Sequence, residues 1–253
     1  MAQIVYEYPF NESIRTLLRL EQLFQRLATL ACRESALDHH LALVTLFEIM
    51  DVSSRADIKS DLLQDLERQR KQLTVYRGKP SIDESMLNAE IARAEQAMQR
   101  LNQQPGKTGQ PLVAHDWLMS IRSRISIPGG TCSFDLPSYH AWQHRSAAFR
   151  QAELQTWLTS LDPVAEALTV SLRLLRESGA SQPITASGGR YQQSLGSGRH
   201  VQLARVRVEA DQDWFPEISG NRLLLSIRVM HTDDAGRVEA LLADRSCQLT
   251  LCA

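Results

Sequence analysis

The hydrophobic period of the chain changes near residue 180, and this change restricts the fold more than any other feature. Before it, apolar residues recur every three or four positions, and residues 11–30 are a clear amphipathic helix pattern. After it, residues 200–210 and 222–231 alternate apolar and polar side chains, as strands do. Helices followed by strands predict an α+β fold.

Capping residues and helix breakers predict where the helices begin and end. Asn11 is expected to cap the first helix, and the capping box Ser81-Ile82-Asp83-Glu84 is expected to start the fourth. Residues 126–135 are expected to be irregular because Pro and two Gly residues follow one another there. The expected helices, about seven, cover residues 11–30, 35–51, 54–77, 81–103, 117–125, 137 onward and 164–177.

The domain organisation follows from the same patterns. A helical domain is expected over residues 11–178 and a small, mostly antiparallel sheet over residues 190–253. Residues 181–200 are rich in Gly and Ser, which predicts a flexible connection. Residues 3–8 alternate and stop before Pro9, which predicts a strand that joins the C-terminal sheet.

Two faces are expected for the strand over residues 222–231. Alternation places Leu223, Leu225, Ile227 and Val229 on one face and Arg222, Leu224, Ser226 and Arg228 on the other. A loop with Trp214, Pro216 and Gly220 is expected before this strand, and a last strand is expected over residues 245–252.

The composition excludes several classes of protein. A hydrophobic fraction of 43% with a formal net charge of −1 is typical of a folded chain, not of a disordered one. The 28 Lys and Arg residues are balanced by 29 Asp and Glu residues, so non-specific nucleic-acid binding lacks the basic surface that it needs. The most apolar stretch, residues 41–50, contains Thr45 and Glu48 and is too short to span a membrane. We therefore expect a soluble protein with neither nucleic acid nor membrane as a partner.

The N-terminus and the cysteines indicate a cytoplasmic protein. The first residues contain no basic segment followed by an apolar one, so no secretion signal is expected. Cys32, Cys132, Cys247 and Cys252 show no CxxC spacing. We expect reduced, buried thiols without disulfides, and neither a metal nor another cofactor.

A nucleophilic site is one alternative that the residues leave open. Cys132, Asp135 and His140 lie close in sequence, and a thiol that loses its proton to a histidine is the basis of cysteine-dependent hydrolases and transferases. The other interpretation is that Cys132 is a small buried residue in a loop shaped by glycines. No known nucleophile motif surrounds it.

The other histidines give little indication of chemistry. His140 and His144 lie one helical turn apart, but the local sequence offers no third ligand for a metal ion. His39 and His40 are adjacent, so on a helix their side chains point about 100° apart. We expect these two at the surface or partly packed.

Cationic side chains remain as the main candidates for function. Arg15, Arg19 and Arg26 fall within one narrow stripe of the first helix. Guanidinium groups hold carboxylates by forked hydrogen bonds, which favours binding over catalysis, and a nucleic-acid binder that uses this stripe is a further alternative. The other candidates are Arg55 and Lys59 at the start of the third helix, His140 beside the Pro-Gly-Gly loop, and Arg222 and Arg228 on a strand.

Four segments of the chain carry a resemblance to a known family. They are SIPGGTCSFDLPSYHAW (126–142), YPFNESIRTLLRLEQLF (8–24), LDPVAEALTVSLRLLRES (161–178) and FPEISGNRLLLSIRVM (215–230). Together and in this order they resemble the ZapD family of bacterial cell-division proteins.

The resemblance implies a cytoplasmic, non-enzymatic homodimer that acts at the mid-cell division site and takes no small-molecule substrate. The implied partner is the division GTPase FtsZ, held by its C-terminal tail on a positively charged surface, so that a dimer crosslinks and bundles FtsZ filaments. The residues that match are Arg15, Arg19, His140, Arg222 and Arg228, with Arg55 and Lys59 as weaker additions.

Overall fold

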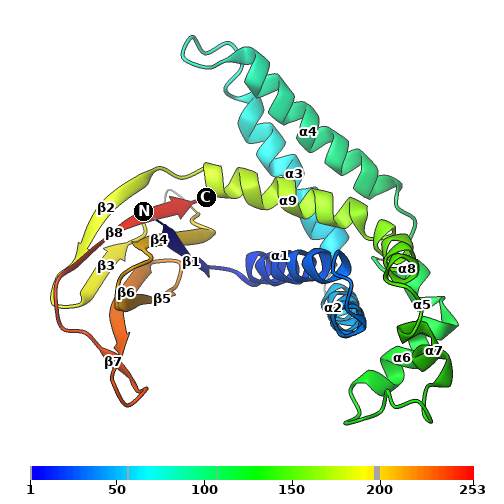
Figure 1. Cartoon of the computed structure of the whole chain (residues 1–253). Coiled ribbons are helices and arrows are strands. Elements are labelled where there is room, and N and C mark those ends of the chain that lie inside the picture. The colour runs from blue at the N-terminus through cyan, green and yellow to red at the C-terminus, as the bar shows by residue number, and fades with distance from the viewer. Residues whose placement is uncertain (1, 56, 107, 197–199) are drawn as a thin grey trace. The chain divides into compact units, whose positions relative to one another are not determined.

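The computed structural model of the chain describes residues 2–55, 57–106, 108–196 and 200–253, without the side chain of Arg55. The chain divides into a helical unit, Leu17–Ser171, and a β unit, which combines Met1–Thr16 with Leu172–Ala253. Figure 1 shows the helices and strands in chain order. Helices at the start of the chain and antiparallel strands at its end confirm the α+β prediction.

The helices of the described residues are α1 (Glu12–Ala31), α2 (Ala36–Arg55), α3 (Ile58–Thr74), α4 (Glu84–Gln103), α5 (Gln110–Val113), α6 (Asp116–Ile125), α7 (Pro137–Gln143), α8 (Ala147–Thr159) and α9 (Asp162–Glu177). These described helices outnumber the roughly seven expected for two reasons. The loop after α4 contains the single turn α5, and Ser146 starts α8 by accepting the Phe149 N–H at 3.3 Å, which separates α8 from α7.

Side-chain caps decide two of the helix starts. Asn11 Oδ1 accepts the Ile14 N–H at 2.8 Å, which confirms the predicted cap of α1. The predicted capping box at Ser81 is wrong, because Asp83 caps α4 and accepts the N–H groups of Ser85 and Met86 at 2.9 and 3.2 Å. Two capping residues stood close together in the sequence, and the second one is used.

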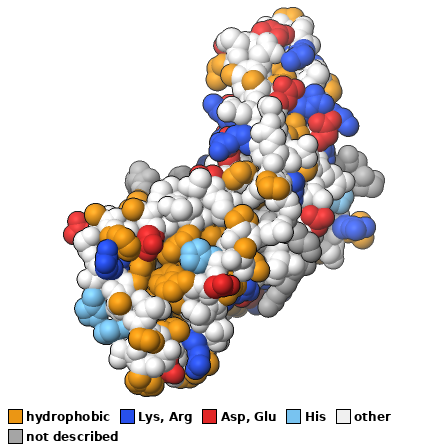
Figure 2. Space-filling model, turned by 90° about the vertical axis from the view of Figure 1, so that its right-hand side faces the viewer, with side chains coloured by type: hydrophobic (Ala, Val, Ile, Leu, Met, Phe, Trp, Pro, Cys, Tyr) orange, Lys and Arg blue, Asp and Glu red, His pale blue; other side chains and the backbone are white. Residues whose placement is uncertain are grey.

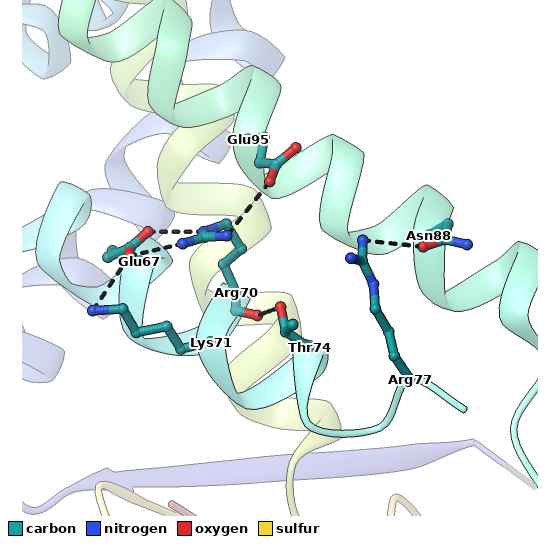
Figure 3. Close-up of polar contacts among 7 residues, drawn as sticks. All are labelled: Glu67, Arg70, Lys71, Thr74, Arg77, Asn88 and Glu95. Carbon is teal, nitrogen blue, oxygen red and sulfur yellow. Dashed lines mark hydrogen bonds and ion pairs between the residues drawn. The ribbon is translucent and has the colours of Figure 1, made fainter. Parts of the chain in front are cut away.

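α3 and α4 form an antiparallel hairpin in the helical unit (Figure 1). Figure 3 shows polar contacts of this hairpin, where Arg70 donates to Glu67 at 2.8 and 2.9 Å and lies 3.6 Å from Glu95 of the other helix. Arg77 donates to Asn88 at 3.2 Å near the tip. The hydrogen bond from Arg70 is the main cause that lowers the pKa of Glu67 to about 2. Charged pairs therefore cover this hairpin on the side that faces water.

An aromatic cluster forms much of the core beneath α6, α7 and α8. It contains Trp117, Tyr139, Trp142 and Trp157, with neighbouring ring centroids 5.6 to 6.3 Å apart. The Tyr139 hydroxyl lies 2.7 Å from Nδ1 of His40, which ties α7 to α2. The cluster holds the short helix α7 in place although seven residues alone would not form a stable helix.

His39 is fully buried, which corrects the expectation that it lies at the surface or partly packed. Its Nδ1 accepts a hydrogen bond from Arg150 Nε at 2.8 Å, and its Nε2 lies 2.6 Å from the Arg33 carbonyl oxygen. Arg150 is itself 5% exposed. This pair could not be predicted from neighbouring residues, because its members are far apart in the chain.

The strands of the described residues are β1 (Gln3–Pro9), β2 (Ser181–Ala186), β3 (Arg190–Ser194), β4 (Leu203–Glu209), β5 (Trp214–Gly220), β6 (Leu224–Thr232), β7 (Val238–Ala240) and β8 (Arg245–Cys252). They form two sheets, ordered β1-β4-β8-β2 and β3-β6-β5, with β7 beside β6. Every pairing between these strands of the described residues is antiparallel, and β1 joins β4 as predicted. The predicted connection at 181–200 and the predicted loop before β6 are wrong, because β2, β3 and β5 occupy them.

The two sheets share one hydrophobic core within the β unit. Val206 and Leu249 contribute from the first sheet, and Leu225 and Ile227 contribute from the second. Because side chains alternate along each strand, the opposite faces of both sheets carry mostly polar residues.

Glu7 of β1 is the centre of a partly buried ion network in the β unit. It accepts two hydrogen bonds from Arg176 of α9, both at 2.8 Å, and one from Arg205 of β4 at 2.9 Å. Burial alone would raise the pKa of Glu7, but the hydrogen bonds and charges of the two arginines outweigh it and lower the pKa below its usual value. The network fixes the end of α9 against the first sheet.

All four cysteines are free, but only two are buried. Cys32 and Cys132 are exposed, which corrects the expectation of buried thiols. Burial raises the pKa of Cys247 and of Cys252 to about 11, so both stay as thiols at neutral pH. Among the helices of the described residues, none combines the length and the apolar character that a membrane span requires.

Candidate functional site

The first candidates lie on α1, where Arg15 and Arg19 are one turn apart. Arg15 Nε is 3.2 Å from Glu12, and Arg19 is exposed. Arg26, further along the predicted stripe, forms an ion pair with Glu48 of α2. Glu12 and Glu48 therefore neutralise part of the positive charge of this stripe. The sequence pattern did not indicate either carboxylate as a neighbour of the stripe.

His140 lies on α7, directly after the irregular segment of the family-like motif. Gly130 allows the chain to pass the end of α6, because a Cβ at this position would lie 2.5 Å from the Arg124 carbonyl oxygen. Tyr139 is buried and His140, the next residue, is exposed. The ring of His140 lies 4.4 Å from that of His144, measured between centroids. The sequence thus places an exposed imidazole on a helix that the aromatic core holds rigid.

Arg222 is exposed, but it does not lie on a strand as predicted. The Asn221 side chain accepts the N–H groups of Leu223 and Leu224 at 2.8 and 3.0 Å, and this turn delays the start of β6 to Leu224. Leu223 is 71% exposed, so its predicted place on the buried face is also wrong. Arg222 forms no hydrogen bond or ion pair within the described ranges of the chain.

Arg228 and Lys59 already have partners. Arg228 of β6 donates to Glu217 of β5 at 2.7 Å, and both side chains are about half exposed. Lys59 Nζ donates to the Gln104 carbonyl oxygen at 2.7 Å, where a cation stabilises the C-terminal end of α4. The side chain of Arg55 lies outside the described residues. Lys59 therefore has a structural role that the sequence did not indicate.

The candidates are divided between the two units. Arg19, Lys59 and His140 belong to the helical unit, and Arg15, Arg222 and Arg228 belong to the β unit. That these cations share one surface stays a prediction. The structure shows how exposed each described cation is and which carboxylates lie beside it.

Arg190 is an exposed cation that the sequence pattern did not indicate as a candidate. Arg190 lies at the start of β3, directly opposite Arg228 in the register of the second sheet. The Gly and Ser content of residues 181–200 predicts a flexible connection, which hides this strand. The alternation of Arg190, Tyr191 and Gln192 was the signal that could have indicated a strand.

Apolar side chains are also exposed in the helical unit. Figure 2 shows them gathered over α5–α8, whereas Lys, Arg, Asp and Glu are mixed over the α3–α4 hairpin. Phe134, within the family-like motif, is 82% exposed, and Ile127 is 47% exposed. This part of the surface therefore combines apolar groups with the imidazole of His140.

The comparison with known protein families gives the decisive observation. The family model described as ZapD, a cell division protein, matches residues 18–228, which is most of the chain. The chain belongs to the ZapD family of cell division proteins.

The match to the ZapD family covers most of the candidate cations. Arg19, Lys59, His140, Arg222 and Arg228 lie within the matched residues, and Arg15 lies before them. A role in cell division follows from the family, and with it a protein partner in the division machinery.

The thiol-nucleophile alternative finds no support in the geometry of this ZapD-family chain. The Asp135 carboxylate lies 3.5 Å from Arg124, and among the residues that the structure describes no imidazole donates to it. No hydrogen bond joins Cys132 to His140 within the part of the chain that the structure describes. In the same described part, no group of three His, Cys, Asp or Glu side chains is arranged to hold a metal ion.

Proposed function

We propose that this ZapD-family protein binds the C-terminal tail of FtsZ and, as a homodimer, crosslinks FtsZ filaments into bundles that stabilise the division ring. Membership of the ZapD family carries the proposal, together with the four matching sequence segments. In this proposal the protein is not an enzyme and acts in the cytoplasm at mid-cell. The residues proposed to hold the tail are Arg15, Arg19, His140, Arg222 and Arg228, with Arg55 and Lys59 as peripheral additions.

The chemistry of these residues supports an acidic peptide as the ligand. Arg19, His140, Arg222 and Arg228 are all exposed, so their cationic or hydrogen-bonding groups can reach a flexible chain. Guanidinium groups bind carboxylates by forked, charge-assisted hydrogen bonds. Lys59 is the weakest member, because its ammonium group already stabilises the end of α4.

The strength of such binding is limited by solvent. An exposed ion pair contributes about 0 to 1 kcal/mol, so one cation cannot hold the tail and several must act together. Two of the proposed cations must also share their charge with Glu12 and Glu217. We therefore expect modest affinity that falls as salt rises, since exposed charges are screened beyond about 8–10 Å.

Bundling needs more than one tail site in each particle. A monomer with one site binds a filament without linking it to another, whereas a two-fold dimer presents the same site twice. Many tails along each filament then convert weak single contacts into strong overall attachment. The homodimer is therefore a necessary part of the proposed mechanism.

Bundling by site variants tests this proposal. We expect Arg19→Glu and His140→Ala to keep their fold and oligomeric state and to lose the bundling of FtsZ filaments in a sedimentation assay. Arg93→Glu is the matched control, because Arg93 is an exposed cation of α4 whose ion pair is with Glu90 of the same helix, at 2.7 Å. Normal bundling by both site variants would reject this site.

A further inference from the structure

A tight hairpin fixes the position of Arg190 at the start of β3. The Arg190 N–H donates to the Ser187 carbonyl oxygen at 3.1 Å, and the Gly189 carbonyl oxygen accepts the Val229 N–H at 2.9 Å. Gly189 has a φ of +75°, and a Cβ there would lie 1.9 Å from the Leu241 carbonyl oxygen. Only glycine meets both demands, so the backbone holds Arg190 in register with β6.

Arg190 and Arg228 share the outer face of the second sheet. They are directly opposite in an antiparallel pair, and such partners have Cβ atoms about 4.5–5.5 Å apart on one face. Tyr191, the next residue on β3, packs against the hydrophobic core, so Arg190 points to the other side. Glu217 of β5 is opposite Arg228 on its other flank. One row across the sheet therefore reads Arg190, Arg228, Glu217.

This row has two cations and one carboxylate. Glu217 is engaged by Arg228, at 2.7 Å from its Nε. Arg190 is exposed, and its side chain forms no hydrogen bond or ion pair with any residue that the structure describes. Like charges directly opposite on neighbouring strands destabilise a sheet. A neutral residue at position 190 would therefore suit the fold better, which is the pattern expected where a side chain serves binding rather than stability.

The next row of the same face is uncharged. It contains Gln192, Ser226 and Ser219, in register across the three strands. Amide and hydroxyl groups hydrogen-bond to peptide groups without attracting a particular charge. The face thus places a cation pair beside groups that suit a peptide backbone.

We propose that Arg190 and Arg228 form a clamp for one carboxylate of an acidic peptide. The inference rests on the proposed function, in which that peptide is the FtsZ tail. Two guanidinium groups with one resident carboxylate leave a single net positive charge, which matches a carboxylate better than the nearly double charge of a phosphate. Glu217 competes with the peptide for Arg228, so it weakens binding while it relieves the repulsion between the two arginines.

Two variants with opposite effects test the clamp, both made in the full chain. The affinity is measured with a synthetic FtsZ C-terminal tail peptide at low and at physiological salt, and the melting temperature is measured beside it. Arg190→Gln is expected to weaken peptide binding about 2- to 5-fold, more at low salt, with an unchanged or higher melting temperature. Glu217→Gln is expected to tighten binding and to lower the melting temperature.

The control is Arg237→Gln, since Arg237 is an exposed cation of the β unit whose guanidinium pairs with Asp233 at 2.8 Å. It is expected to leave peptide affinity unchanged. If Arg190→Gln binds with wild-type affinity while Arg228→Gln is weakened, the clamp is refuted and the proposed function stands. A lower melting temperature for Arg190→Gln also refutes it, because the guanidinium would then be structural. If the wild-type protein does not bind the tail at all, the proposed function and the clamp both fail.

Discussion

Arg150 should be the most costly polar residue of the helical unit to replace. It is 5% exposed and donates to His39 Nδ1 at 2.8 Å, to the Glu34 carbonyl oxygen at 2.6 Å and to the Gln143 carbonyl oxygen at 3.1 Å. It also donates to the carbonyl oxygen of Arg145. One guanidinium therefore ties the loop before α2 to the connection between α7 and α8.

The size of the effect follows from these four hydrogen bonds. In Arg150→Met, three carbonyl oxygens and one ring nitrogen lose their donor, and each buried acceptor left unpaired costs about 1–3 kcal/mol. Water can reach the exposed loop residues Glu34 and Arg145, so the lower value applies to them, and the apolar Met side chain offsets about 1–2 kcal/mol by packing. These contributions give a net loss of about 2–7 kcal/mol in the free energy of unfolding, at the upper end of the range for a single substitution.

Urea denaturation followed by tryptophan fluorescence measures this loss. Trp117, Trp142 and Trp157 all lie in the helical unit, so the signal reports mainly on it. Arg145→Met is the matched control, because it leaves the Arg145 carbonyl oxygen in place and removes an exposed guanidinium that lies over the Phe149 ring, 4.3 Å from its centroid, a contact worth about 0.5–1 kcal/mol. If Arg150→Met lowers the free energy of unfolding no more than the control does, the stabilising role of the buried Arg150 hydrogen bonds is refuted.

Three further predictions concern pH, the family motif and stoichiometry. Burial is the main cause that lowers the pKa of His39, so the unfolded chain takes up the proton first and stability falls as pH drops below about 6.5, by at most about 1.4 kcal/mol per pH unit. His39→Gln supplies an acceptor and a donor without titrating and should flatten that slope in denaturation curves between about pH 5 and 7; an unchanged slope would contradict this. Gly130→Ala should lower the melting temperature by several degrees, because its Cβ would meet the Arg124 carbonyl oxygen, and a neutral result would show that the loop adjusts freely. A variant held monomeric should still bind the FtsZ tail and fail to bundle filaments, and undiminished bundling by a true monomer would reject bridging.

The sequence predicted the helices, the central strands and the edge strand β1 well, but it failed for the edge strands β2, β3 and β5. β4 and β6 alternate clearly because one face of each is buried. β2 contains Pro183 and β5 contains Pro216, and prolines normally argue against a strand. Both strands are at sheet edges, where a missing N–H need not break a ladder. Position in a sheet depends on distant partners, so these two strands could not be predicted locally.

The candidate site shows the same division between local and distant information. The exposure of Arg19 agrees with the stripe that helix periodicity predicts for α1, whereas the exposure of His140 is seen only in the structure. The partner of Arg228 and the cap that Lys59 provides come from other elements, and neither could be read from neighbouring residues. The sequence thus shows where the cationic residues are, but not which of them already bind a carboxylate or a carbonyl oxygen of the same chain.

Co-sedimentation with FtsZ polymers tests the central claim most directly. The wild-type protein is mixed with polymers of intact FtsZ and, in parallel, with polymers of FtsZ that lacks its C-terminal tail. We predict that the protein pellets with the intact polymers in a salt-dependent manner and stays in the supernatant with the tail-less ones. Equal pelleting with both kinds of polymer would contradict recognition of the tail by exposed cations.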